Sequence, residues 1–178
     1  MTRARDIANF GDGIATADIG DGQITTAKIA SGAITDALLP AGSVLQVVQG
    51  TYSTAVSATS TSYVDTGLSA SITPSSASSK ILVMTTQQIA TSNASAGSYQ
   101  VIINLLRDST QIIESFRSPW VNSERAIGSR QSITYLDSPN TTNSITYKTQ
   151  FRSPSGGQTS IANMNDSDAS IILMEIAG

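Results

Sequence analysis

Apolar residues return at a constant interval of five near the start of the chain. The row is unbroken and consists of Ile14, Ile19, Ile24, Ile29, Ile34 and Leu39. An interval of five matches neither the 3.6-residue period of a helix nor the two-residue period of a strand, so neither element keeps these side chains on one face. Self-similarity at a short fixed period is typical of stacked or wound architectures. The segment is therefore expected to form a structured repeat, because a flexible linker has no reason to keep Ile at fixed positions.

Two architectures can bring each of these residues back to a common line. One is a single-chain quadrilateral β-helix, since residues 17–19, 27–29 and 37–39 resemble the pentapeptide-repeat pattern. The other is three identical chains wrapped together, each contributing its row to a shared core. A single thin column buries little surface by itself. The three-chain stalk over residues 12–40 is favoured, and the single-chain form remains open.

The remainder of the chain, residues 41–178, has the pattern of an all-β domain. Charged residues make up only 13% of the sequence, about half of the roughly 25% that is usual in globular domains. Short apolar or alternating runs are separated by turns rich in Pro, Gly, Ser, Asn and Asp, which is typical of a β-sandwich. The predicted strands are residues 43–51, 63–73, 80–91, 98–107, 111–118, 131–137, 144–151, 159–164 and 169–176. We expect a jelly-roll-like antiparallel sandwich that forms the head of the molecule.

The strands differ in how many of their faces are apolar. Ile145, Tyr147, Thr149 and Phe151 alternate with polar residues, as expected of a strand with one face in water. Residues 81–84, 101–103 together with 105–106, and 171–174 are apolar on both faces. A sandwich strand buries one face in the core, so a partner subunit is expected to cover the other face of these strands.

Composition excludes several classes of function. The chain contains no His and no Cys, which removes thiolate nucleophiles, His or Cys zinc sites and Ser-His-Asp relays. A net charge of −3 without a basic patch argues against a nucleic-acid partner, and no apolar stretch reaches the roughly 20 residues needed for membrane insertion. The first residues are basic, but the apolar core of a secretory signal does not follow them. The expected protein is not an enzyme, holds no metal or cofactor, and is assembled in a bacterial cytoplasm.

The repeat and the head resemble the tail-fibre and related virion fibre proteins of bacteriophages. The stalk motif is Gly22-Gln-Ile-Thr-Thr-Ala-Lys-Ile-Ala30, and the head motifs include Gly42-Ser-Val-Leu-Gln-Val-Val48 and the terminal Ile172-Leu-Met-Glu-Ile-Ala177. The resemblance implies a homotrimeric fibre or spike in the virion, with an N-terminal anchor over residues 1–11 and an exposed head that attaches to the host. Because 178 residues is short for a complete tail fibre, a capsid decoration protein or head fibre remains an alternative.

Two sets of residues are candidate contact sites. The anchor to other phage structural proteins, of the tail or the capsid, would use apolar side chains in a groove and arginines paired with carboxylates; its residues are Arg3, Arg5, Asp6, Ile7 and Phe10. A frayed terminus is the alternative. A loop containing Trp120 and Asn122 is a candidate for binding a host surface glycan or protein, because Trp stacks on sugar rings. Trp120 is more commonly read as a hydrophobic plug under a loop or at a subunit seam.

Two further segments carry oxygen-bearing side chains without forming a convincing site. Residues 163–168 lack the Gly and the bidentate Glu of a calcium loop, so a turn before the last strand explains them better. A polysaccharide-degrading tailspike would need a pair of carboxylates, and nothing in the spacing of Glu114, Glu124 and Glu175 brings them together. A carbohydrate-binding adhesion module with the same sandwich is a further alternative, because a fold does not fix a function.

Overall fold

The computed structural model describes residues 24–25, 29, 35, 38–92, 100–117, 127–154 and 158–178, without the side chains of 92, 115–117 and 127. The chain divides into two units, Met1–Leu39 and Pro40–Gly178. The predicted anchor and three members of the apolar row, Ile14, Ile19 and Ile34, lie outside the described residues. Of the other members, Ile24 is 55% and Ile29 41% exposed in a single chain. The trimeric or β-helical form of the stalk stays a prediction.

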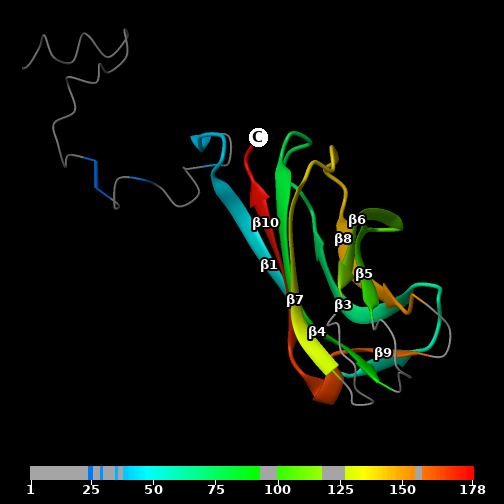
Figure 1. Ribbon diagram of the computed structural model, residues 1–178. Coiled ribbons are helices and arrows are strands. Elements are labelled where there is room, and N and C mark those ends of the chain that lie inside the picture. Colours follow the sequence, from blue (N-terminus) through cyan, green and yellow to red (C-terminus); the bar gives the residue numbers. More distant parts are fainter. Residues whose placement is uncertain are drawn as a thin grey trace, which may run out of the picture. The chain divides into compact units, whose positions relative to one another are not determined.

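The second unit consists of two antiparallel sheets packed face to face (Figure 1). Sheet A contains β1 (Val44–Tyr52), β2 (Val56–Ala58), β4 (Lys80–Ser92), β7 (Ile127–Asp137), β9 (Thr159–Ala162) and β10 (Ala169–Ile176). Sheet B contains β3 (Val64–Ile72), β5 (Val101–Arg107), β6 (Thr110–Arg117) and β8 (Ile145–Arg152). A short 3-10 turn, η5 (Met164–Asp166), precedes β10. No helix among the described residues is long and apolar enough to cross a membrane.

The strand order is that of a jelly roll. In sheet A, β10 lies between β1 and β4, and β7 pairs with the opposite edge of β4. In sheet B the order is β3-β8-β5-β6. The chain passes from one sheet to the other at nearly every connection between long strands, and the β5–β6 hairpin is the step that stays within a sheet. The four strands β1, β10, β4 and β7 of sheet A and the four strands of sheet B have the order of a jelly roll, to which β2 and β9 are added in sheet A. This order confirms the all-β, jelly-roll-like sandwich expected from the sequence.

All nine predicted strands are present, and the differences are at their ends. The predicted strand 131–137 is the second half of β7, which begins at Ile127. The polar first half has no apolar alternation, and it is extended because it pairs with β4 as far as Thr91. The predicted strand 159–164 ends at Ala162, where η5 follows. The three-residue β2 was not predicted, since so short a segment leaves no periodic signal.

Alternating side chains of the two sheets fill the core. Ile145, Tyr147, Thr149 and Phe151 of β8 are buried, and the residues that alternate with them are only partly buried, which confirms the one-faced pattern of that strand. Ile145, Tyr147 and Phe151 pack in one cluster with inward residues of neighbouring strands, which include Leu68, Ile81, Val83, Ile103, Leu105, Ile171 and Leu173. Burial of a side chain of this size contributes about 1.5–3 kcal/mol, which makes this cluster the main source of stability.

A chain of hydrogen bonds crosses the core between the sheets. The hydroxyl of Thr66 on β3 lies 2.6 Å from that of Thr149 on β8, and Thr149 donates to the side-chain oxygen of Gln87 on β4 at 3.0 Å. The Gln87 amide then donates to the Asn163 side chain at 3.0 Å. Asn163 in turn donates to the carbonyl of Thr54 at 3.1 Å. Each of these four side chains has a partner, so the polar row costs little and specifies how the sheets are aligned.

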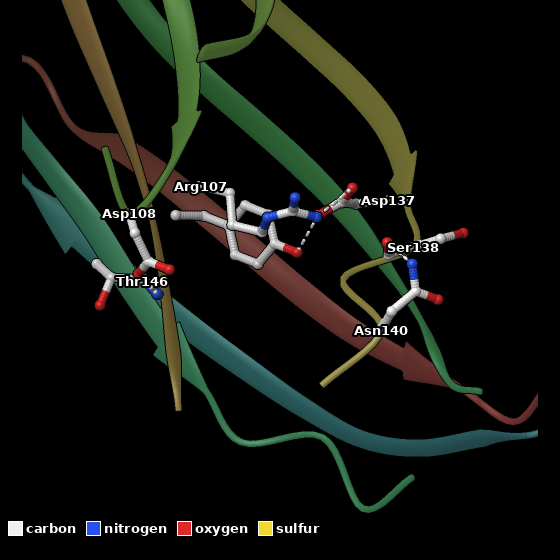
Figure 2. Close-up of polar contacts among 7 residues, drawn as sticks. Arg107, Asp108, Asp137, Ser138, Asn140 and Thr146 are labelled. Carbon is white, nitrogen blue, oxygen red and sulfur yellow. Dashed lines mark hydrogen bonds and ion pairs between the residues drawn. The ribbon is translucent and has the colours of Figure 1, made fainter. Parts of the chain in front are cut away.

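A second polar link joins the sheets through an ion pair (Figure 2). Arg107, at the end of β5 in sheet B, donates to both carboxylate oxygens of Asp137, at the end of β7 in sheet A, at 3.0 and 2.8 Å. The Tyr147 hydroxyl donates to the same carboxylate at 2.6 Å. The carboxylate therefore holds β5, β7 and β8 together at one end of the sandwich.

Candidate functional site

One surface of the sandwich is apolar although it faces away from the core. Side chains alternate along a strand, so the neighbours of the inward core residues of sheet A point outward. In the strand register Met174 on β10 lies opposite Val47 on β1 and Leu82 on β4, and Leu82 lies opposite Leu136 on β7. We call this surface the outer apolar face; it consists of Val44, Val47, Leu82, Met84, Leu136, Ile172, Met174 and Ile176.

The margins of the outer apolar face are open to solvent. Val47 is 57% exposed, and Val44 and Leu136 are each 50% exposed. The residues between them are half-buried. Leu82 and Met174 have apolar neighbours on both adjacent strands, and Ile172 and Met84 have one apolar and one polar neighbour each. Four strands about 4.8 Å apart and about 20 Å of strand length give a patch of roughly 400 Å². Apolar patches of this size on soluble proteins commonly mark interaction sites.

The character of sheet A changes along its strands. Beyond the outer apolar face the next row contains Ser170, Thr86 and Ser132, and the hydroxyls of Thr86 and Ser132 lie 3.3 Å apart. Farther along, Arg130 donates to the carbonyl of Asp168 at 3.1 Å. The apolar part is therefore confined to the end of the sheet where β1 begins.

The outer face of sheet B carries charged and polar side chains along β3 and β8. Lys148 lies 3.1 Å from Asp65, and Arg152 lies 3.6 Å from Glu114 and 5.2 Å from the ring centre of Tyr63. These charged side chains are stable in water without a cover. The exposed apolar side chains are therefore on the outer face of sheet A, and the exposed ion pairs are on that of sheet B.

This contrast corrects one part of the expectation from the sequence. Of the three strands predicted to need a partner, β4 and β10 do contribute to the outer apolar face. For β5 the prediction is wrong: its outward Ile102 and Leu106 are 2% and 7% exposed in a single chain. They need no partner subunit, because the chain itself already removes them from water. Val44, Val47 and Leu136 were missed, and only the strand register shows that they extend the face.

A buried carboxylate fixes β1 at the margin of this face. Glu175 on β10 is fully buried. One of its oxygens accepts a hydrogen bond from the Gln46 amide on β1 at 2.5 Å, and the other accepts from the backbone N–H and the hydroxyl of Ser75, each at 2.7 Å. Burial alone would raise the pKa of the Glu175 carboxyl, but these hydrogen bonds outweigh it and hold the pKa below its ordinary value. The charged form is therefore the one that the fold stabilises.

Stability should consequently fall in acid. A carboxyl whose pKa is lower in the folded state contributes stability above its unfolded pKa, near 4.5, and this contribution disappears as the pH falls through the folded pKa. We expect Glu175→Gln to lower the free energy of unfolding at pH 7 by about 1.5–3 kcal/mol, the range for hydrogen bonds to a charged group. The variant should lose less additional stability than the parent between pH 5 and pH 3. Urea unfolding at pH 7, 5 and 3 measures both effects, and an equal loss in the two proteins would contradict this role.

The remaining predicted site residues fall into two groups. Arg3, Arg5, Asp6, Ile7, Phe10, Trp120 and Asn122 lie outside the described residues, as does Glu124. The structure describes Glu114 and Glu175 on different sheets, the first beside Arg152 and the second buried with Gln46 and Ser75. It does not bring these two together as a carboxylate pair. Residues 163–168 form the turn containing η5, where the Asp166 side chain accepts from the Ala55 backbone N–H at 3.0 Å.

The sandwich has two distinct ends. The chain enters at Ser43, and the strand ends found there are the start of β1 and β4 and the end of β7 and β10, as shown by the pairs Val44–Ile176, Ile176–Lys80 and Ile81–Asp137. At the other end, Thr91 pairs with Ile127 and Ser160, and Val101 pairs with Arg117. The described strand ends that flank connections 93–99, 118–126 and 155–157 therefore all lie at the end opposite the entry point.

Comparison with known proteins identifies no family for this chain. No model of a known protein family matches the chain, and no curated protein matches it. Among solved structures, dimeric latent PorU from Porphyromonas gingivalis is 13% identical over 78% of this chain and 14% of PorU, with a TM-score of 0.38. The VP2 subviral particle of infectious bursal disease virus is 12% identical over 75% of this chain and 38% of VP2, with a TM-score of 0.36. The chain spans well under half of the length of these proteins.

Proposed function

We propose that this protein is a non-enzymatic structural component of a bacteriophage virion, a homotrimeric tail fibre or spike whose sandwich head contacts the host surface. The observation that carries the proposal is the two-ended layout of the head. The N-terminal repeat joins the sandwich at one end. The described ends of three connections gather at the other end. A protein that links a particle to a cell needs one end for the particle and one for the cell.

Exposed apolar side chains in the N-terminal repeat support the same assignment. The described members of the apolar row are exposed in one chain. Copies of the chain joined through this row would remove it from water. Three heads on one stalk would also strengthen a weak contact with a host glycan or protein, because binding of the first head raises the effective concentration of the others.

The mass of the purified protein tests the assembly directly. Each chain weighs 18.5 kDa, and native mass spectrometry is expected to give about three times this value, near 55.5 kDa. We expect three copies because a single Ile row offers too little apolar surface to form a core within one chain. A mass of 18.5 kDa at micromolar concentration would contradict the trimer, and with it the proposal that the protein forms a fibre.

Attachment is tested with fluorescently labelled protein and a panel of bacterial cells. A fibre head is expected to bind some strains saturably, and unlabelled protein should compete. Incubation with purified surface polysaccharide from a strain that binds is expected to release no reducing ends. Release of reducing ends would favour a polysaccharide-degrading spike, and absence of binding to every strain would favour a capsid decoration role.

A further inference from the structure

We infer that the outer apolar face of sheet A packs against a second copy of this chain. The inference rests on the proposed function, since it names the partner of a surface in the assembled fibre. It goes further in assigning the head, and not only the N-terminal repeat, to the subunit interface.

The chemistry of the face suits contact with its own copy. Its eight residues are uncharged and apolar, and they end at Lys80 on one side and at the hydroxyl row of Thr86 and Ser132 on the other. Two such faces can meet without bringing like charges together. The outer face of sheet B, with Asp65, Lys148 and its other charged residues, has neither the need nor the chemistry for such a contact.

The size of the face indicates that the contact depends on a tether. A stable interface usually buries about 800 Å² per partner, and the outer apolar face offers roughly half of this. Alone it would support only a weak association. An apolar contact of this size becomes stable when another part of the molecule already holds the copies close together.

The chain supplies such a tether next to the face. Leu39, the last member of the Ile row, precedes Val47 by eight residues, a distance of at most about 28 Å along an extended chain. Val44 lies still closer to the repeat in sequence. Copies joined through the N-terminal repeat are therefore constrained to keep their outer apolar faces within reach of one another.

Cysteine protection in the full chain tests this inference. The chain has no Cys, so single variants Val47→Cys and Leu136→Cys each carry one reactive thiol at a position that is about half exposed in one copy. Ser69→Cys is the matched control, because Ser69 is exposed on the outer face of sheet B. We expect a bulky maleimide to react at least about tenfold more slowly at positions 47 and 136 than at position 69, and equally fast at all three after unfolding in urea.

Each result has a distinct meaning when combined with the native mass. Slow reaction at positions 47 and 136 in a multi-copy protein supports the inference. Fast reaction in a multi-copy protein overturns it and leaves the fibre proposal standing on the N-terminal repeat. Slow reaction in a single-copy protein means that the chain's own N-terminal segment covers the face, which overturns both the second-copy contact and the trimer. Slow reaction in a multi-copy protein that binds no cells supports the inference and removes the attachment role.

Discussion

Replacement of Asp137 by Ala is expected to lower the free energy of unfolding by about 3 kcal/mol. The Asp137 side chain is 7% exposed and accepts hydrogen bonds from Arg107 and from the Tyr147 hydroxyl. Burial raises the pKa of Tyr147, and the hydrogen bond to the negatively charged Asp137 raises it further. The hydroxyl therefore stays protonated and remains a donor. Without the carboxylate, a guanidinium and a phenol are left at the sheet junction without their acceptor. Breaking a buried pair by removing one partner is far more costly than losing an exposed one.

The matched control is an exposed ion pair in the same sandwich. Asp65 pairs with Lys148 at 3.1 Å, but its side chain is 56% exposed. Asp65→Ala is expected to cost less than about 1 kcal/mol, because water screens the pair and replaces its hydrogen bonds. Urea unfolding of both variants at pH 7 gives the comparison. Similar midpoints for the two variants would mean that the Arg107–Asp137 pair does not hold the two sheets together.

Phe151→Ala is expected to cost about 3–5 kcal/mol, the largest effect of a single substitution proposed for this protein. Phe151 is fully buried. It lies opposite Val64 on β3 and Ile103 on β5, so it is surrounded on both sides within sheet B and faces the core. Its removal leaves a cavity that two hydrogen-bonded sheets cannot close without losing their register. The loss therefore includes both the transfer of the ring to water and the empty volume.

A conservative variant separates the cavity from other causes. Phe151→Leu keeps most of the apolar volume and should cost roughly 1–2 kcal/mol. Both free energies of unfolding come from urea titrations, and equal slopes would show that the denatured states are comparable. An Ala variant that loses less than about 1 kcal/mol would contradict the placement of Phe151 at the centre of the core.

The sequence alone determined the fold class and most strand positions. The alternation of Ile145, Tyr147 and Phe151 with polar residues predicted which side of β8 faces the core, because a two-residue period is a local property of a strand. The runs around Leu82 and Met174 are apolar on both faces of the strand, and they likewise predicted an apolar outer surface that a partner covers. Prolines and Ser-rich turns marked the boundaries. All of these signals connect residues a few positions apart.

The tertiary structure decided which of these residues meet. The strand register placed Val47, Met174, Leu82 and Leu136 in one row, and it brought Arg107 to Asp137, thirty residues farther along the chain. It also buried the outward side of β5, where the sequence pattern had favoured a partner. Pairing between distant strands depends on which edges and registers bury the most surface at once. No local period carries that information, so the outer apolar face and the buried carboxylates emerge only from the folded sandwich.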